Sequence, residues 1–179
     1  MKAMIIVNNG LEECEALITY DLLYRAGIKT DLVGFTDEIL SSHEVRFKAH
    51  RLLDEIDPAE YDCLILPGGM PGTKNLENDE RVQKLINDFV KENKLIAAIC
   101  AAPSVLGAAG LLNGKEATCH PGFEETLTGA EVVTGVTVVQ SGNIITSRGM
   151  GTAIDFALAI VRYLSDDATV YEVKKHLVY

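Results

Sequence analysis

Short apolar runs alternate along the chain with longer segments in which apolar residues recur at helical spacing. The apolar runs cover residues 3–7, 63–66 and 95–99, and residues 29–33 form a further strand-like segment. A continuous apolar run of this length is typical of a strand buried on both faces of a parallel sheet. Residues 45–49 predict a short edge strand, and residues 136–139 and 144–146 predict a hairpin around Ser141-Gly142-Asn143.

Helical spacing predicts helices at residues 12–26, 79–92, 101–109, 152–164 and 168–177, whereas Pro67-Gly68-Gly69-Met70-Pro71-Gly72 predicts a loop. The alternation of strand and helix predicts an α/β fold, with a mostly parallel sheet between helices on both faces, in one domain spanning residues 1–179. Ligands bind at the carboxyl ends of the strands in such sheets. That rule selects the loops after Val7, Leu66, Ile99 and Thr146.

Composition and charge argue against several classes of protein. Hydrophobic residues make up 47% and charged residues 23% of the chain, which is ordinary for a globular protein and argues against disorder. A net charge of −10 without a basic patch argues against nucleic-acid binding. No run reaches the ~18 to 20 apolar residues that span a bilayer. The apolar N-terminus is too short for a signal peptide, so we expect a cytoplasmic protein with no membrane partner.

Cys100 is the strongest candidate for a nucleophile. It directly follows the predicted strand 95–99, and small neighbours permit the sharp strand-to-helix turn called a nucleophile elbow. A helix N-terminus at this position favours a thiolate over a thiol. The alternative is a buried structural cysteine.

The other cysteines are weaker candidates. The four cysteines form no C-x-x-C pair, which argues against a structural zinc site, and a cytoplasmic chain of this size needs no disulfide. Cys63 lies inside a strand and is expected in the core. Cys14 has acidic neighbours that raise its pKa. Cys119 precedes a histidine and is a secondary candidate.

The first predicted helix opens with the carboxylates of Glu12, Glu13 and Glu15. Acidic residues are favoured in any first helical turn by the helix dipole. One of them could instead reach across the sheet edge to Cys100, to bond its sulfur or carry a proton. The residues alone leave the choice among the three open.

Three further positions carry candidate chemistry. Gly68 and Gly69 follow a strand, and their N–H groups could form an oxyanion hole with that of Ala101, although a simple tight turn is the alternative. His120 is a candidate base if it meets Cys100. Arg148 could bind an anionic substrate or brace its loop by donating to carbonyls, and we favour bracing. The remaining histidines have no evident partner: His43, His50 and His176.

In their order and spacing, several segments resemble the ThiJ/PfpI superfamily, and within it the Parkinsonism-associated deglycase (glyoxalase III-like) branch. The resemblance covers nearly the whole chain. It is carried by Gly10-Leu11-Glu12-Glu13-Cys14-Glu15, Leu66-Pro67-Gly68-Gly69, Ala97-Ala98-Ile99-Cys100-Ala101, Thr118-Cys119-His120-Pro121 and Thr146-Ser147-Arg148-Gly149.

The resemblance implies a flavodoxin-like three-layer sandwich and a homodimer. It maps the family's reactive cysteine onto Cys100, its acidic partner onto Glu15 and its histidine onto His120. It implies a glyoxalase or deglycase that acts without metal or cofactor on 2-oxoaldehydes (methylglyoxal, glyoxal) or on their early adducts with proteins and nucleotides. The alternative is a redox-sensing chaperone in which Cys100 oxidises to a sulfinate.

Two related activities are disfavoured by departures from their patterns. The pattern of the protease branch has a histidine directly after the nucleophile, whereas this chain has Ala101 at that position. Class I glutamine amidotransferases carry glycines where Ala98 and Ala102 stand, and a His-x-Glu pair where His120 is followed by Pro121.

The first predicted helix also bears on assembly. A helix that covers one side of a sheet needs only one apolar stripe. This helix is apolar over more than one face, through Leu17, Ile18, Tyr20, Leu22, Leu23 and Tyr24. The surplus agrees with the homodimer that the resemblance implies.

Overall fold

In the computed structural model, which describes residues 1–179, all the predicted strands except that at residues 45–49 lie in one seven-stranded sheet. Its strands lie in the order β10-β11-β7-β6-β1-β2-β5. Their bounds are Val138–Ser141 for β10, Ile144–Ser147 for β11, Leu95–Ile99 for β7, Cys63–Leu66 for β6, Lys2–Val7 for β1, Lys29–Gly34 for β2 and Arg51–Leu52 for β5. All pairs are parallel except β10 with β11, the predicted hairpin.

The register of the central strands brings their carboxyl ends to one edge of the sheet. Leu66 at the end of β6 pairs with Ala98 of β7, and Ile99 at the end of β7 pairs with Ser147 of β11. The loops that follow these three strands therefore leave the sheet side by side. This is the edge at which open α/β sheets bind their ligands.

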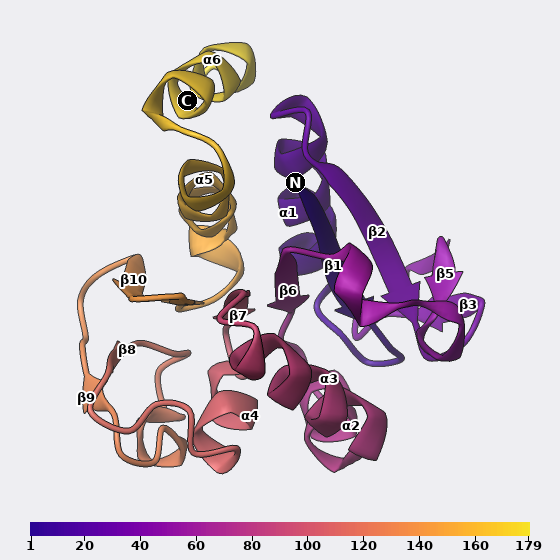
Figure 1. Ribbon diagram of the computed structural model, residues 1–179, viewed down its shortest axis with the longest axis vertical. Helices are drawn as coiled ribbons and strands as arrows, with labels where there is room; N and C mark the ends of the chain where they lie inside the picture. The colour runs from indigo at the N-terminus through magenta and orange to yellow at the C-terminus, as the bar shows by residue number, and fades with distance from the viewer.

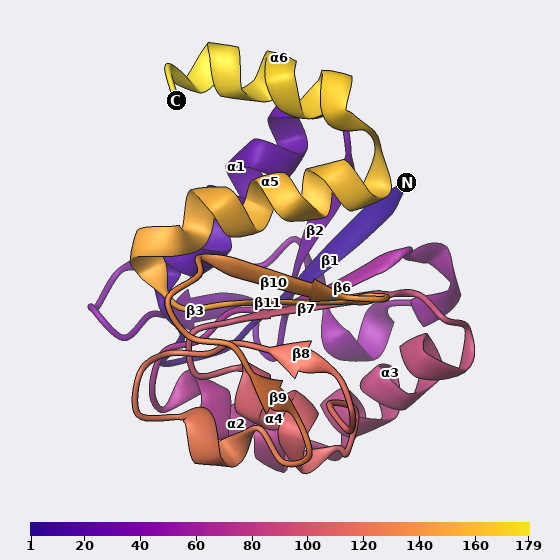
Figure 2. The same cartoon turned by 90° about the vertical axis from the view of Figure 1, so that its left-hand side faces the viewer.

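Helices cover both faces of the sheet, as Figures 1 and 2 show. On one face lie α1 (Glu13–Arg25), α5 (Ala153–Leu164) and α6 (Asp167–Leu177), and on the other lie α2 (Gly72–Asn78), α3 (Glu80–Lys91) and α4 (Pro103–Ala108). Two separate apolar cores result, because alternate residues of β1 point to opposite faces: Ile5 packs with α1 and α5, and Ile6 with α3 and α4. The predicted flavodoxin-like three-layer sandwich is confirmed.

Several short elements differ from the sequence-based expectation. The strand expected at residues 45–49 is β4 (Arg46–Lys48), which pairs with β3 (Glu38–Leu40) in a sheet of its own, and the edge of the main sheet is β5. The loop expected over residues 67–72 is one residue shorter than predicted, because α2 begins at Gly72. A further pair, β8 (Glu116–Ala117) and β9 (Glu131–Val132), was not predicted. None of the helices is both long and apolar enough to cross a lipid bilayer.

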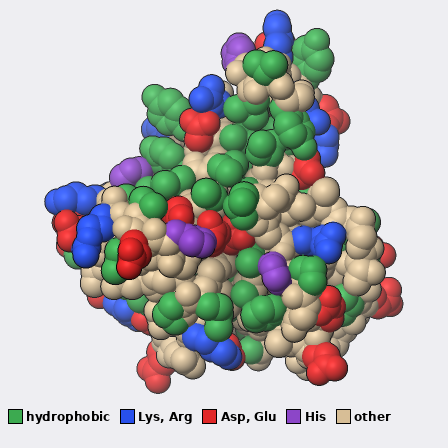
Figure 3. Space-filling view, turned by 180° about the vertical axis from the view of Figure 1, so that it is seen from behind, with side chains coloured by type: hydrophobic (Ala, Val, Ile, Leu, Met, Phe, Trp, Pro, Cys, Tyr) green, Lys and Arg blue, Asp and Glu red, His purple; other side chains and the backbone are tan.

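Apolar side chains remain on the face of α1 that the chain itself leaves open. Leu17, Ile18 and Tyr20 are only partly buried, and Tyr24 is 71% exposed. Hydrophobic side chains gather on the upper part of the surface in Figure 3, at the level of α1 and α5. An exposed apolar patch of this kind is typical of an interaction surface.

We propose that a second copy of the chain covers this face. Sedimentation equilibrium at micromolar concentration is expected to give twice the chain mass of 19.4 kDa, because joining two such faces removes apolar surface from water. A single species of 19.4 kDa under these conditions contradicts the proposal.

Candidate active site

Cys100 lies on a sharp turn between β7 and α4. Its φ of 66° is left-handed, which is rare for a residue other than glycine. The Cys100 N–H donates to the Ser147 carbonyl (3.0 Å), and the Ala102 N–H donates to the Ile99 carbonyl (3.1 Å), so the turn is fixed at both ends. The predicted elbow is present. The helix predicted from residue 101 instead begins at Pro103, because the left-handed residue inserts a turn before it.

Two backbone N–H groups, from Gly69 and Ala101, donate toward the Cys100 sulfur and favour negative charge there. Gly69 has a φ of 89°, and a side chain on it would collide with the backbone nitrogen of Glu12. These are two of the three predicted oxyanion-hole donors. The third expectation, Gly68, is wrong, because its N–H already donates to Oε2 of Glu15 (2.8 Å).

Glu15, on the first turn of α1, is the carboxylate that reaches Cys100. Its side chain is 1% exposed and lies within hydrogen-bonding reach of the thiol, while Oε1 has no hydrogen-bond partner. A β-carbon on Gly68 would lie 2.6 Å from the β-carbon of Cys100 and 2.9 Å from Oε2 of Glu15, so only glycine allows this approach. The choice among three carboxylates that the residues left open is thus made by burial.

Burial and mutual repulsion govern the charge of this pair. Burial raises the pKa of Glu15 to about 7, although the bonds from Gly68 and Cys100 oppose the rise. Burial, followed by the Glu15 carboxylate, raises the pKa of the Cys100 thiol to about 12, against the two N–H groups. Because the pair is strongly coupled, it accommodates one negative charge rather than two. The thiol and the carboxyl therefore share one proton, and the expected resting thiolate stays a prediction.

His120 is exposed at the rim of the site. Its backbone N–H donates to the Cys100 carbonyl (2.8 Å), which ties the two loops together. Its Nδ1 lies 2.9 Å from the Pro121 carbonyl and donates to it, which leaves Nε2 of a neutral ring free to accept a proton. A β-carbon on Gly149 would lie 3.5 Å from Cδ2 of His120, 3.9 Å from Oε1 of Glu15 and 4.0 Å from the Cys100 sulfur. The imidazole edge therefore faces the same space as the thiol.

An open hollow of about 350 Å³ adjoins the thiol on the Gly149 side. Gly149 is a neighbour of the reactive pair that sequence reasoning did not single out, although the segment containing it contributed to the family resemblance. The residues that line the hollow come from two loops: His120, Pro121, Arg148, Gly149, Met150, Gly151 and Thr152.

The other three cysteines all have raised pKa values. Cys63 is fully buried in β6, which raises its pKa, as expected of a core residue. The pKa of Cys14 is raised by burial and then by Glu12 and Glu13, in the predicted direction. Cys119 is 4% exposed, and burial raises its pKa to about 11.

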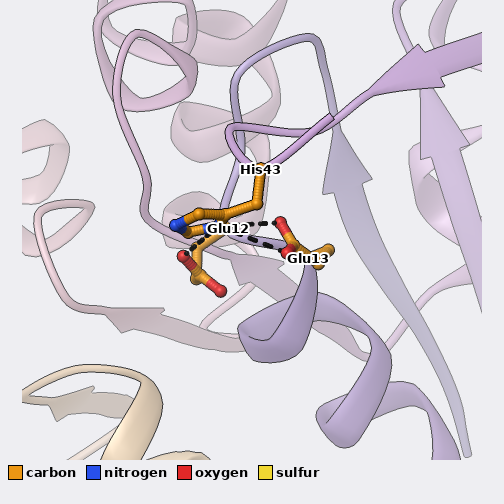
Figure 4. A group of neighbouring side chains, drawn as sticks. All are labelled: Glu12, Glu13 and His43. Carbon is orange, nitrogen blue, oxygen red and sulfur yellow. Dashed lines mark hydrogen bonds and ion pairs between the residues drawn. The ribbon is translucent and has the colours of Figure 1, made fainter. Parts of the chain in front are cut away.

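Glu12 and Glu13 point toward His43, as Figure 4 shows. The Nδ1 atom of His43 lies 3.3 Å from Oε2 of Glu12 and 3.2 Å from Oε1 of Glu13. His43 therefore has the partners that the sequence did not indicate. The ligand atoms of Glu12, Glu13 and His43 are close enough together to bind a cation. The contacts between the imidazole and the two carboxylates are sufficient to explain why these side chains lie together.

Comparisons with known proteins identify the family of the chain. The model of the DJ-1/PfpI family matches residues 1–163. The chain belongs to the DJ-1/PfpI family. Among its relatives, Drosophila melanogaster protein dj-1beta is 38% identical over 98% of this chain and 95% of its own.

Other members of the DJ-1/PfpI family extend the likeness. A Caenorhabditis elegans relative named glutathione-independent glyoxalase DJR-1.2 is 36% identical over 86% of this chain and 82% of its own. The solved structure of oxidized Toxoplasma gondii DJ-1 matches with a TM-score of 0.95 at 32% identity, over 99% of this chain and 98% of that one.

The raised pKa of Glu15 predicts a pH-dependent contribution to stability. The native state binds the Glu15 proton more tightly than the unfolded chain does. The native state therefore loses stability relative to the unfolded chain as pH rises from the ordinary value of 4.5 to about 7. Glu15→Gln removes this ionisation. The free energy of unfolding of Glu15→Gln minus that of wild type should therefore be about 3 kcal/mol larger above this pH window than below it.

Urea unfolding at about pH 4 and about pH 8.5, on either side of this window, measures this difference. Glu12→Gln is the matched control, since it removes the same charge from a half-buried carboxylate that faces His43. A stability difference between Glu15→Gln and wild type that is independent of pH contradicts the assignment.

Proposed function

We propose that the protein is a cytoplasmic, cysteine-dependent glyoxalase or deglycase that acts on 2-oxoaldehydes such as methylglyoxal and glyoxal, or on their early adducts with proteins and nucleotides. The observation that carries the proposal is the contact between the Cys100 thiol and the buried Glu15 carboxyl, whose pKa of about 7 suits a general base near neutral pH. The name of the Caenorhabditis elegans relative supports the same chemistry.

The first step is addition of sulfur to the aldehyde. As the Cys100 sulfur bonds to the aldehyde carbon, its proton passes to the Glu15 carboxylate, which removes the need for a resting thiolate. The aldehyde oxygen gains the negative charge and takes the same proton from Glu15, which completes the hemithioacetal and returns Glu15 to a carboxylate. The N–H groups of Gly69 and Ala101 lie where they can hold this oxygen as the charge develops.

The second stage moves hydrogen within the substrate. Glu15 or the free Nε2 of His120 removes the proton from the former aldehyde carbon, and an enediol forms. Reprotonation at the neighbouring carbon gives a thioester. Water then hydrolyses the thioester, which releases a 2-hydroxy acid and restores the thiol. The sum is methylglyoxal plus water giving lactate, with no external oxidant or reductant and no part for a metal.

This mechanism predicts lactate formation from methylglyoxal by protein freed of metal with a chelator. Cys100→Ser is expected to abolish turnover, because a hydroxyl beside Glu15 is a far weaker nucleophile. The measurement is lactate released per enzyme over time. Equal rates from wild type and Cys100→Ser would refute the mechanism.

Glu15→Gln tests the proton carrier. Gln can still accept the Gly68 N–H but cannot take the thiol proton, so we expect a loss of about 10²-fold or more in kcat/KM for methylglyoxal. Glu12→Gln provides the matched control, since its carboxylate faces His43. Wild-type turnover in Glu15→Gln would remove Glu15 from the mechanism and favour His120.

A second candidate, a redox-sensing chaperone, is supported by the oxidised state of the Toxoplasma gondii relative. Cys100 is half-buried whereas Cys63 and Cys119 are buried, so peroxide has better access to it. Two equivalents of peroxide would convert the thiol to a sulfinic acid and release two waters. The N–H groups and a protonated Glu15 could then bind the sulfinate oxygens.

This candidate predicts selective oxidation. Mass spectrometry after mild peroxide treatment is expected to show two added oxygens at Cys100 and no change at Cys63, and Glu15→Gln should retain this reactivity because Gln still offers a donor. Uniform modification of all four cysteines would contradict a sensor function.

A further inference from the structure

Arg148 is the one lysine or arginine that lines the hollow, and its charge acts on the buried Cys119 thiol, whose pKa burial raises and Arg148 lowers. It follows β11 directly and is half-buried, yet its guanidinium makes neither a hydrogen bond nor an ion pair. The expectation that it braces its loop is wrong. The Thr152 hydroxyl does so instead, accepting from the Gly149 N–H (3.2 Å) and donating to the Gly149 carbonyl (2.9 Å).

The charge of the hollow is opposite to that of the protein. Its lining holds Arg148 and His120 but no carboxylate, in a chain whose net charge is −10. An unpaired, half-desolvated guanidinium favours an anion, and its planar set of N–H donors matches a carboxylate in a bidentate arrangement. The lining therefore suits a small carboxylate.

The size of the hollow leaves room for more than the smallest aldehydes. A three-carbon aldehyde takes about the volume of four waters, each of which occupies ~30 Å³ in the liquid, whereas the hollow measures about 350 Å³. Arg148 directly precedes Gly149 in the chain, both line the hollow, and a β-carbon on Gly149 would lie 4.0 Å from the Cys100 sulfur. A substrate bonded to Cys100 through its aldehyde carbon can thus extend its other end toward Arg148.

We infer that Arg148 is a specificity residue that binds a carboxylate on the far end of the substrate, so that the preferred substrates are 2-oxoaldehydes with a carboxylate tail. The inference rests on the proposed function for its aldehyde, but the recognition of a carboxylate near Cys100 does not depend on turnover. The two can therefore be tested apart.

Alkylation of Cys100 measures carboxylate recognition without catalysis. N-iodoacetylglycine and N-iodoacetylglycinamide carry the same electrophile and differ in one terminal carboxylate. In both, sulfur displaces iodide, so the ratio of their rates at Cys100, read by peptide mass spectrometry, cancels any change in the thiol's pKa. We expect wild type to favour the carboxylate reagent, and Arg148→Gln to lower the ratio about tenfold or more.

Two further variants sharpen the comparison. Arg148→Lys keeps the charge without the planar set of donors and should fall between wild type and Arg148→Gln. Arg162→Gln makes the same change near the far end of α5, where the arginine is exposed and paired with Asp167, and should keep the wild-type ratio. Circular dichroism and thermal unfolding establish that each variant is folded. An Arg148→Gln ratio equal to that of wild type in folded protein overturns the inference.

Turnover then tests the substrate class. The ratio of kcat/KM for 4,5-dioxopentanoate, a 2-oxoaldehyde with a terminal carboxylate, to that for methylglyoxal should fall about tenfold or more in Arg148→Gln. A fall in the alkylation ratio in a protein that makes no lactate supports carboxylate recognition and refutes the glyoxalase proposal. Lactate formation with an unchanged alkylation ratio supports the glyoxalase and refutes the role of Arg148.

Discussion

The hydrogen bond from the Gly68 N–H to the Glu15 carboxyl is the contact on which the rest of the site depends. It holds a carboxyl group that is 1% exposed directly beside a thiol, and it leaves the other carboxyl oxygen without a partner. Burying a carboxylate with so few donors is unfavourable. The packing of α1 sustains the arrangement, because Ala16, Leu22 and Leu23 of the same helix lie in the core against α5. The strain of the site is offset by apolar contacts elsewhere along the helix.

The sheet register explains why this pair meets the other groups. Because the ends of β6, β7 and β11 lie at one edge, the loops after Leu66, Ile99 and Ser147 supply the Gly69 donor, the Cys100 thiol and the Arg148–Gly149 segment to one place. The His120 loop is attached to that edge by its bond to the Cys100 carbonyl. A slip of one residue in β7 would turn Cys100 to the opposite face of the sheet, so the geometry of the candidate site is a consequence of strand pairing.

Sequence patterns predicted the long elements because period and burial agree in them. The strands β1, β6 and β7 are continuous apolar runs, and the core-facing side of α3 repeats at helical spacing. Strands of two residues, such as β5, β8 and β9, are too short to show a period. The start of α4 was misplaced because no residue pattern announces the left-handed φ of Cys100. Likewise, a first helical turn favours any acid, so burial in the folded chain was needed to separate Glu15 from Glu12 and Glu13.

The raised pKa values of Glu15 and Cys100 link the reactivity of the thiol to the charge of the carboxyl. In the proposed mechanism, the Cys100 thiol gives its proton to Glu15 as the sulfur attacks, and the developing negative charge needs another place to go. A carbonyl oxygen positioned at the Gly69 and Ala101 N–H groups provides that place, because negative charge leaves the sulfur as the new bond forms. Activation is therefore coupled to the presence of a correctly oriented carbonyl. In the proposed mechanism, the preference of Cys100 for carbonyl compounds therefore depends on the proton shared with Glu15 as well as on the shape of the hollow.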